Sequence, residues 1–193
     1  MTEVRAFSWR APGAVRVLQT QVGISEAHQP TTPPGISAPT PQVFMAIWDT
    51  GATSSVITQN VVDACGLKQV GMTMSHHAQG VSQVPTYAVN IFLPNGVQFP
   101  IVPVTLGVLP PGTDALIGMD IIAAGDFVLS TAGGETMFSY RYPALGVPDF
   151  VVGIDKMNAK QAARMRLHGH KNNASGPTPL HQKTPPRSKR KKR

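Results

Sequence analysis

The sequence of 193 residues has one cysteine, few aromatic residues and no apolar run of membrane-spanning length. A single cysteine, Cys65, excludes an intrachain disulfide, so the cysteine content gives no indication of an oxidising compartment. Residues 1–16 lack the apolar core of a signal peptide, and we therefore expect an intracellular, cytoplasmic protein without a membrane partner. The 18 Gly and 18 Pro favour a turn-rich β fold over a helical bundle.

Acidic residues are missing from the last part of the chain. Residues 1–155 hold five Lys/Arg and ten Asp/Glu, whereas residues 156–193 hold twelve Lys/Arg and no acid. The net charge of +7 therefore combines an acidic body with a basic tail. The terminal run within residues 183–193 could contact nucleic acid or an acidic partner. A solvated tail is the alternative, since no aromatic side chain is interleaved there to stack on bases.

The most informative stretch is residues 43–57, V-F-M-A-I-W-D-T-G-A-T-S-S-V-I. Its apolar start predicts a buried strand that delivers one carboxylate, Asp49, to a tight turn. A charge at the end of a buried strand is costly unless it is hydrogen-bonded, and Gly51 permits the close backbone approach that this requires. The candidate donors are the backbone N–H groups and hydroxyls of Thr50, Thr53, Ser54 and Ser55.

The sequence Asp49-Thr50-Gly51-Ala52 after an apolar strand resembles the active-site loop of retropepsin-like aspartic proteases. A second element, A-L-I-G-M-D-I-I at residues 115–122, is similar to the hydrophobic-hydrophobic-Gly signature that lies behind the catalytic loop in that family. The resemblance covers about residues 14–150. It implies a supporting loop made of Leu116, Ile117 and Gly118.

The resemblance also implies roles for the residues of the first motif. Asp49 would perform the chemistry, Thr50 would lock two such loops together, and Gly51 would contact the substrate backbone. Ala52 agrees with retroviral-type enzymes, whereas a Ser often follows in pepsins; with one donor fewer, we predict activity that extends toward neutral pH. Met119 stands where retroviral enzymes commonly have Arg, so their Arg-centred ion-pair network is absent or differently built around Asp120.

Aspartic proteolysis needs two carboxylates a few ångströms apart, one acting as general base on a water and the other as proton donor. The chain contains one D-T-G, and no other Asp is followed by Thr-Gly. If the chain is catalytic, Asp49 must therefore meet Asp49 of a second copy in a two-fold homodimer. We expect neither a cofactor nor a metal in this chemistry.

Residues 71–86 contain two short alternating arms around a tip. In retropepsin-like enzymes this position belongs to the flap, a hairpin that closes over the substrate, with a glycine near the tip as a hinge. The adjacent histidines 76 and 77 would point to opposite faces, so they predict no metal site. A solvated hairpin tip remains the alternative to substrate contact. The flap candidates are His77, Ala78, Gln79 and Gly80.

We expect an all-β fold, a retropepsin-like closed β-barrel equivalent to half of an acid protease, with short helices and a basic C-terminal tail. The expected domains are an N-terminal arm, a protease domain, a short helix and a disordered basic tail, at residues 1–13, 14–150, 151–168 and 169–193. The arm lacks a clear pattern and is expected to be frayed. Asn95-Gly96 predicts a hairpin turn between strands at 87–93 and 97–106, and a terminal hairpin is expected across 127–140.

The sequence predicts an aspartic endopeptidase that hydrolyses peptide bonds with a water activated by an intersubunit Asp49/Asp49 dyad. Its polypeptide substrate would bind as an added strand beneath two flaps. The alternative is a non-catalytic dimeric interaction module of the same fold, whose basic tail binds nucleic acid or an acidic partner.

Overall fold

A computed structural model of the chain describes residues 3–29, 38–77, 80–146 and 149–172. The chain divides into two compact units, residues 1–147 and residues 148–193, and each is described here by itself. Within the described ranges, no helix is both long enough and apolar enough to cross a membrane.

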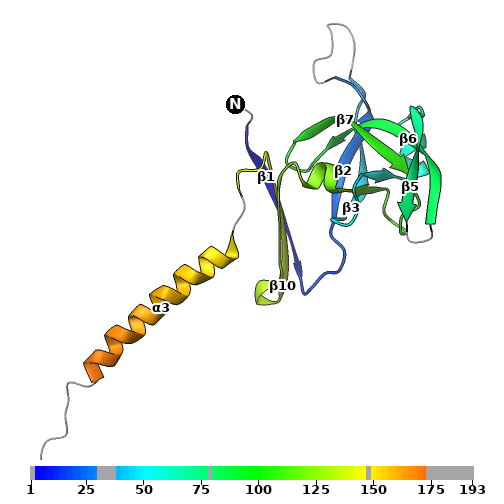
Figure 1. Ribbon diagram of the computed structural model, residues 1–193. Coiled ribbons are helices and arrows are strands. Elements are labelled where there is room, and N and C mark those ends of the chain that lie inside the picture. Colours follow the sequence, from blue (N-terminus) through cyan, green and yellow to red (C-terminus); the bar gives the residue numbers. More distant parts are fainter. Residues whose placement is uncertain (1–2, 30–37, 78–79, 147–148, 173–193) are drawn as a thin grey trace, which may run out of the picture. The chain divides into compact units, whose positions relative to one another are not determined.

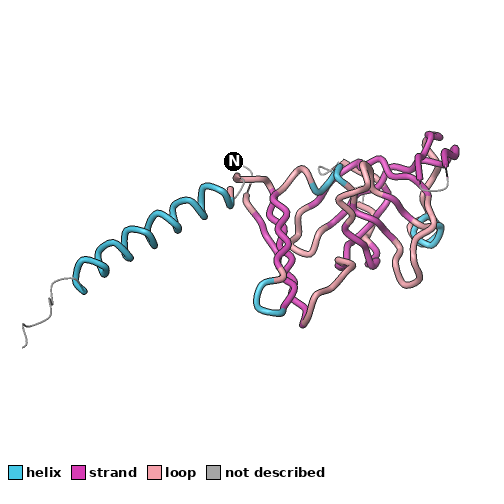
Figure 2. Tube along the Cα trace, turned by 60° about the horizontal axis from the view of Figure 1, so that its bottom comes forward, coloured by secondary structure: helices cyan, strands magenta, loops and turns pink. Residues whose placement is uncertain are grey.

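The first unit is built almost entirely from strands and loops (Figure 2), so the predicted all-β fold is confirmed. Its helical segments are short: α1 (Gln59–Ala64), α2 (Met119–Ile122) and the 3-10 turn η1 (Ala132–Gly134). The strands are β1 (Arg5–Pro12), β2 (Gln19–Glu26), β3 (Gln42–Trp48), β4 (Val56–Ile57), β5 (Gly71–His77), β6 (Gly80–Phe92), β7 (Gln98–Leu106), β8 (Ala115–Ile117), β9 (Asp126–Ser130) and β10 (Glu135–Tyr142).

Seven of the strands form one sheet in the order β2-β3-β8-β4-β7-β6-β5. Because β2 also pairs with β6, the sheet closes on itself and leaves β5 as an appended strand (Figure 1). The expected closed barrel is therefore present. Its interior is apolar, as the alternating strands predict. The buried side chains include Val22, Ile24, Ala46, Ile57, Val61, Val89, Ile91, Val104 and Ile117.

The other three strands form a separate sheet in the order β1-β10-β9. The terminal hairpin expected across residues 127–140 is present as β9 and β10. The prediction of a frayed arm at residues 1–13 is wrong, because β1 pairs with β10 in an antiparallel ladder from Arg5 to Pro12 (Figure 1). Its inward positions are Phe7, Trp9 and Ala11, so the segment carries a period-two pattern on one half-buried face.

Aromatic side chains join the two sheets. The indole of Trp48, the last residue of β3, lies 5.0 Å from the ring of Phe138 and 5.1 Å from that of Tyr140, both on β10. Phe127 of β9 and Phe7 of β1 lie 6.3 Å and 6.0 Å from the same indole. These centroid separations are in the range of favourable aromatic pairs. Trp48 therefore contacts all three strands of the smaller sheet.

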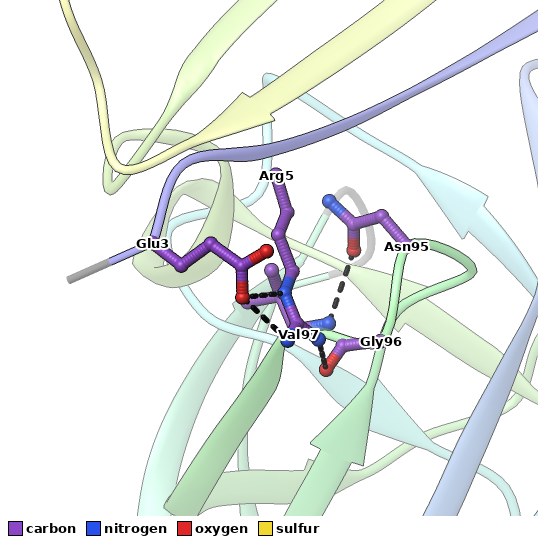
Figure 3. A network of polar contacts seen from close by, with 5 residues as sticks. All are labelled: Glu3, Arg5, Asn95, Gly96 and Val97. Atoms are coloured by element: carbon purple, nitrogen blue, oxygen red, sulfur yellow. Dashed lines mark hydrogen bonds and ion pairs between the residues drawn. The ribbon is translucent and has the colours of Figure 1, made fainter.

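A polar contact also holds the start of β1 against the barrel (Figure 3). Arg5 donates from its guanidinium to the carbonyl oxygen of Gly96 at 3.2 Å and pairs with Glu3 at 2.7 Å. Gly96 has φ +75°, and Asn95 Oδ1 accepts from the N–H of Val97 at 3.2 Å. The predicted Asn95-Gly96 turn between β6 and β7 is thus confirmed, and it also provides the acceptor for Arg5.

The strand β7 is irregular at Ile101, and it contains two prolines, which have no N–H to donate to a neighbouring strand. The register with β6 shifts beside Asn90, and Ile101 adopts φ +54°, which is rare for a β-branched residue. The buried Asn90 side chain accepts the N–H of Ile101 at 2.8 Å and donates to the carbonyl oxygen of His28 at 2.9 Å. A side chain therefore replaces the ladder hydrogen bonds that the bulge removes.

The second unit contains one helix, α3 (Phe150–Asn172). Asp149 caps it by accepting the N–H groups of Val151 and Val152 at 2.8 and 3.3 Å. The helix predicted at residues 151–168 is therefore longer than expected, and residues 169–172 belong to it rather than to a disordered tail. The remaining tail, including the basic run at 183–193, lies outside the described residues.

An ion pair near the end of the smaller sheet makes its stability dependent on pH. The pKa of Asp126 is lowered, first by the backbone N–H of Leu145 and then by the hydrogen-bonded guanidinium of Arg141. A carboxylate whose pKa is lower in the folded state stabilises that state fully above the unfolded pKa of about 3.9. The contribution is lost as the pH falls through the folded pKa.

We therefore expect Asp126→Asn to lower the thermal midpoint at pH 7, and the difference from wild type to disappear in strong acid. Thermal unfolding followed by circular dichroism between pH 7 and pH 2 checks this. Asp155→Asn, which removes a carboxylate from α3, is the control for a change in net charge. A difference between Asp126→Asn and wild type that is independent of pH would contradict the assignment.

Candidate active site

The loop after β3 holds the carboxylate of Asp49 at the rim of the barrel. The N–H of Asp49 donates to the carbonyl oxygen of Ile117 at 3.0 Å, which continues the β3–β8 pairing by one residue. The half-buried Asp49 side chain turns back, and its Oδ1 accepts the N–H of Gly51 at 2.8 Å. A Cβ on residue 51 would lie 3.2 Å from that oxygen, so a glycine suits this close approach.

The second motif lies directly behind this loop. Its strand β8 runs parallel to β3, with Ile117 opposite Trp48. At Gly118 a Cβ would lie 2.6 Å from the carbonyl carbon of Ser54 and 2.7 Å from its oxygen, so a side chain has no room there. The N–H of Met119 donates to the carbonyl oxygen of Ala52 at 2.8 Å. The structure thus brings the two sequence motifs together.

Ser55 and Asp120 form a second connection between the two motifs, which the sequence analysis missed. The carboxylate of Asp120 accepts the N–H of Ser55 at 2.9 Å and its hydroxyl at 2.8 Å. The same hydroxyl oxygen accepts the N–H of Gly118 at 3.1 Å. Ser55 is buried and therefore holds Asp120 rather than Asp49, for which it had been one candidate donor.

Within the described ranges, the Ser55–Asp120 connection is made without a cationic partner. Residue 119 is methionine, and among the described residues Asp120 has no cation within ion-pair distance. Asp120 also accepts the N–H of Ile121 at 3.0 Å, so neutral donors satisfy the carboxylate. The only signal for it in the sequence was the position of Asp120 two residues after Gly118.

Tyr140 fixes the other end of α2. Its hydroxyl donates to the carbonyl oxygen of Ile121 at 2.7 Å, from a fully buried position on β10. Burial is the main cause that raises the pKa of Tyr140 above its usual value, with smaller effects of Tyr142 and Asp126. The phenol therefore remains a donor, and it connects the smaller sheet to the turn behind the Asp49 loop.

The predicted flap is a hairpin of β5 and the first part of β6. The two strands pair from Gly71 with Thr86 to His77 with Gly80, and Gly80 has φ +130°, in the region that favours glycine. Ala78 and Gln79 at the tip lie outside the described residues. Within the described ranges, no group of three or more His, Cys, Asp or Glu side chains is arranged to hold a metal ion.

Residues 41–124, which include both motifs, match a protein-family model described as "gag-polyprotein putative aspartyl protease". The resemblance of the chain to retropepsin-like aspartic proteases is thereby confirmed. The search of curated proteins found no match.

Two solved structures are similar at low identity. One is a retropepsin-like aspartic protease from Rickettsia conorii, with 10% identity, a TM-score of 0.43, and coverage of 73% of this chain and 97% of that one. The other is EIAV protease complexed with the inhibitor HBY-793, with 19% identity, a TM-score of 0.40, and coverage of 56% of this chain and 86% of that one.

Removal of the Ser55 hydroxyl tests the connection between the motifs. We expect Ser55→Ala to lower the free energy of unfolding by about 1–3 kcal/mol, because the buried N–H of Gly118 loses its acceptor. Chemical denaturation measures this difference. Ser54→Ala, at the exposed neighbouring position, is the matched control and should change stability by less than about 0.5 kcal/mol. Equal effects of the two variants would show that the hydroxyl of Ser55 does not hold the loops together.

Proposed function

We propose that the protein is a homodimeric aspartic endopeptidase in which Asp49 of each copy supplies one of two catalytic carboxylates. The observation that supports this most is the position of Asp49. It follows a buried strand, is half-buried itself, and accepts one hydrogen bond from Gly51 through Oδ1. No other carboxylate among the described residues is hydrogen-bonded to this loop except Asp120, whose oxygens are engaged by Ser55 and Ile121. The second catalytic carboxylate must therefore come from another copy.

In the proposed dimer the two Asp49 carboxylates share one proton, because two negative charges so close together repel strongly. The ionised member takes a proton from a water molecule as that water attacks the scissile carbonyl carbon. The protonated member donates its proton to the carbonyl oxygen. Collapse of the tetrahedral intermediate then breaks the C–N bond: the amine nitrogen takes the proton that the first carboxyl received from water, and a hydroxyl of the intermediate returns a proton to the second carboxylate.

The substrate would bind as an extended strand between the catalytic loop and the β5–β6 hairpin. An extended peptide offers backbone N–H and C=O groups on both edges, and a hairpin above it supplies complementary backbone groups. Gly51, with its exposed backbone, is the proposed contact from the loop, and the hairpin tip near Gly80 is the proposed contact from above. Closure of the hairpin would exclude water from the dyad.

Cleavage of a peptide library derived from denatured proteins tests the proposal. We expect wild type to cut peptides between acidic and neutral pH. Asp49→Asn should lose activity by at least about 10³-fold, because an amide cannot act as the general base. The variant should retain its fold and its dimer, measured by circular dichroism and sedimentation. A dimeric wild type that makes no cuts would overturn the enzymatic proposal and favour a dimeric interaction module.

Mixing the two forms tests whether the site is shared between copies. Random exchange of equal amounts of wild type and Asp49→Asn leaves about a quarter of the dimers with two aspartates, so activity should fall to about half of that of the same wild-type protein alone. An obligatory dyad contributed by two copies requires this loss. If the activity after full exchange instead equals that of the same wild-type protein alone, each copy carries a complete site and the proposal of a shared dyad is wrong.

A further inference from the structure

Trp48 is the residue through which the smaller sheet can act on the proposed catalytic aspartate. It immediately precedes Asp49, and its indole is buried against aromatic rings from β1, β9 and β10. Its main chain is held by the barrel, since the N–H of Trp48 donates to the carbonyl oxygen of Leu18 at 3.0 Å. The backbone of Trp48 thus belongs to the barrel, whereas its indole packs against the smaller sheet.

Thr20 provides the hydrogen-bond acceptor for this indole. The indole Nε1–H donates to Thr20 Oγ1 at 2.9 Å, and both residues are buried. Among the described residues, no other hydrogen bond of the Trp48 side chain is present. Thr20 lies on β2, opposite Ala46 of β3, and Ala46 is two residues before Trp48. The strand that pairs with β3 therefore also carries the acceptor for the indole. A buried N–H that loses its acceptor is costly, so the orientation of the indole depends on the hydroxyl of Thr20.

We propose that Thr20 is a positioning residue for the reaction proposed above, and that it acts through the indole of Trp48. The hydrogen bond fixes the ring between the aromatic side chains of the smaller sheet and the barrel. The ring in turn fixes the direction in which the chain leaves β3 and therefore the place of the Asp49 carboxylate. Small displacements of a catalytic group reduce the rate of the chemical step strongly, with up to about 100-fold loss for 1 Å. The inference rests on the proposed function, since it concerns the rate of that reaction.

Thr20→Val and Thr20→Ser form the matched pair of variants. Valine keeps the shape and removes the acceptor, whereas serine keeps the hydroxyl and removes a methyl group. We expect Thr20→Val to lower kcat about tenfold with KM within about twofold of wild type, because positioning affects the chemical step more than ground-state binding. Thr20→Ser should restore kcat to within about twofold of wild type.

A double-mutant cycle with Trp48→Phe tests whether Thr20 acts through the indole. Phenylalanine has no N–H, so the acceptor on residue 20 becomes unnecessary. Thr20→Val should therefore reduce kcat about tenfold in the Trp48 background and by less than about twofold in the Trp48→Phe background. Equal effects in both backgrounds would overturn the inference, as would a loss of kcat in Thr20→Ser that equals the loss in Thr20→Val.

The closing measurement separates this inference from the proposed function. The kinetics are carried out with the full chain at concentrations where sedimentation shows each variant to be a dimer. The emission spectrum of Trp48 is recorded in a Trp9→Phe background, which leaves it as the only indole. Absence of cleavage by wild type would defeat the proposed function itself. Cleavage by wild type, together with an unchanged kcat and an unchanged emission spectrum in Thr20→Val, would overturn only the role of Thr20.

Discussion

The close approach of Gly118 to the loop that follows Asp49 is the constraint on which the rest of the site depends. A Cβ at this position would overlap the carbonyl group of Ser54, so the two segments can meet only where one residue has no side chain. Two hydrogen bonds form only because the two segments lie this close together. One runs from the N–H of Met119 to the carbonyl oxygen of Ala52, and the other from the N–H of Ser55 to the carboxylate of Asp120. Three contacts from one short turn, made by Gly118, Met119 and Asp120, therefore hold the backbone from Ala52 to Ser55 in place. The position of Asp49 depends on this loop and on the hydrogen bond from its own N–H to Ile117.

The first unit contains two sheets, and they differ in the segments that they carry. The barrel carries the loop that follows β3, the turn that packs against it and the β5–β6 hairpin, while the sheet of β1, β10 and β9 is built from segments near the two ends of the first unit. Trp48 and Tyr140 connect them, one through aromatic packing and the other through a hydrogen bond to α2. Both connections reach the site within one or two residues of the motifs. Trp48 and Tyr140 therefore connect the smaller sheet directly to the two segments that meet around the Asp49 loop, in addition to the contacts of Arg5 with Gly96 and of Tyr142 with Phe99.

The sequence was sufficient where the determinants are local. The end of the apolar strand at Asp49, the Asn95-Gly96 turn and the apolar strand before Gly118 each depend on residues adjacent in the chain, and all are present as predicted. The contact of Ser55 with Asp120 joins residues 65 positions apart, and a serine and an aspartate have too many alternative partners for such a pair to be identified from sequence. The pairing of β1 with β10 is equally non-local. Phe7 and Trp9 carried its pattern, but their short alternation gave no indication of the partner strand.

The length of β6 determines how the β5–β6 hairpin is joined to the barrel. This strand of 13 residues pairs with β5 in its first half and with β7 and β2 in its second, and Thr86 is paired on both edges, with Gly71 and with Thr105. Thr86 is therefore the residue at which β6 passes from the hairpin into the barrel: the segment before it pairs with β5, whereas the segment after it is part of the barrel wall. On the β6 side, the hairpin is therefore joined to the barrel wall by one uninterrupted strand rather than by a loop.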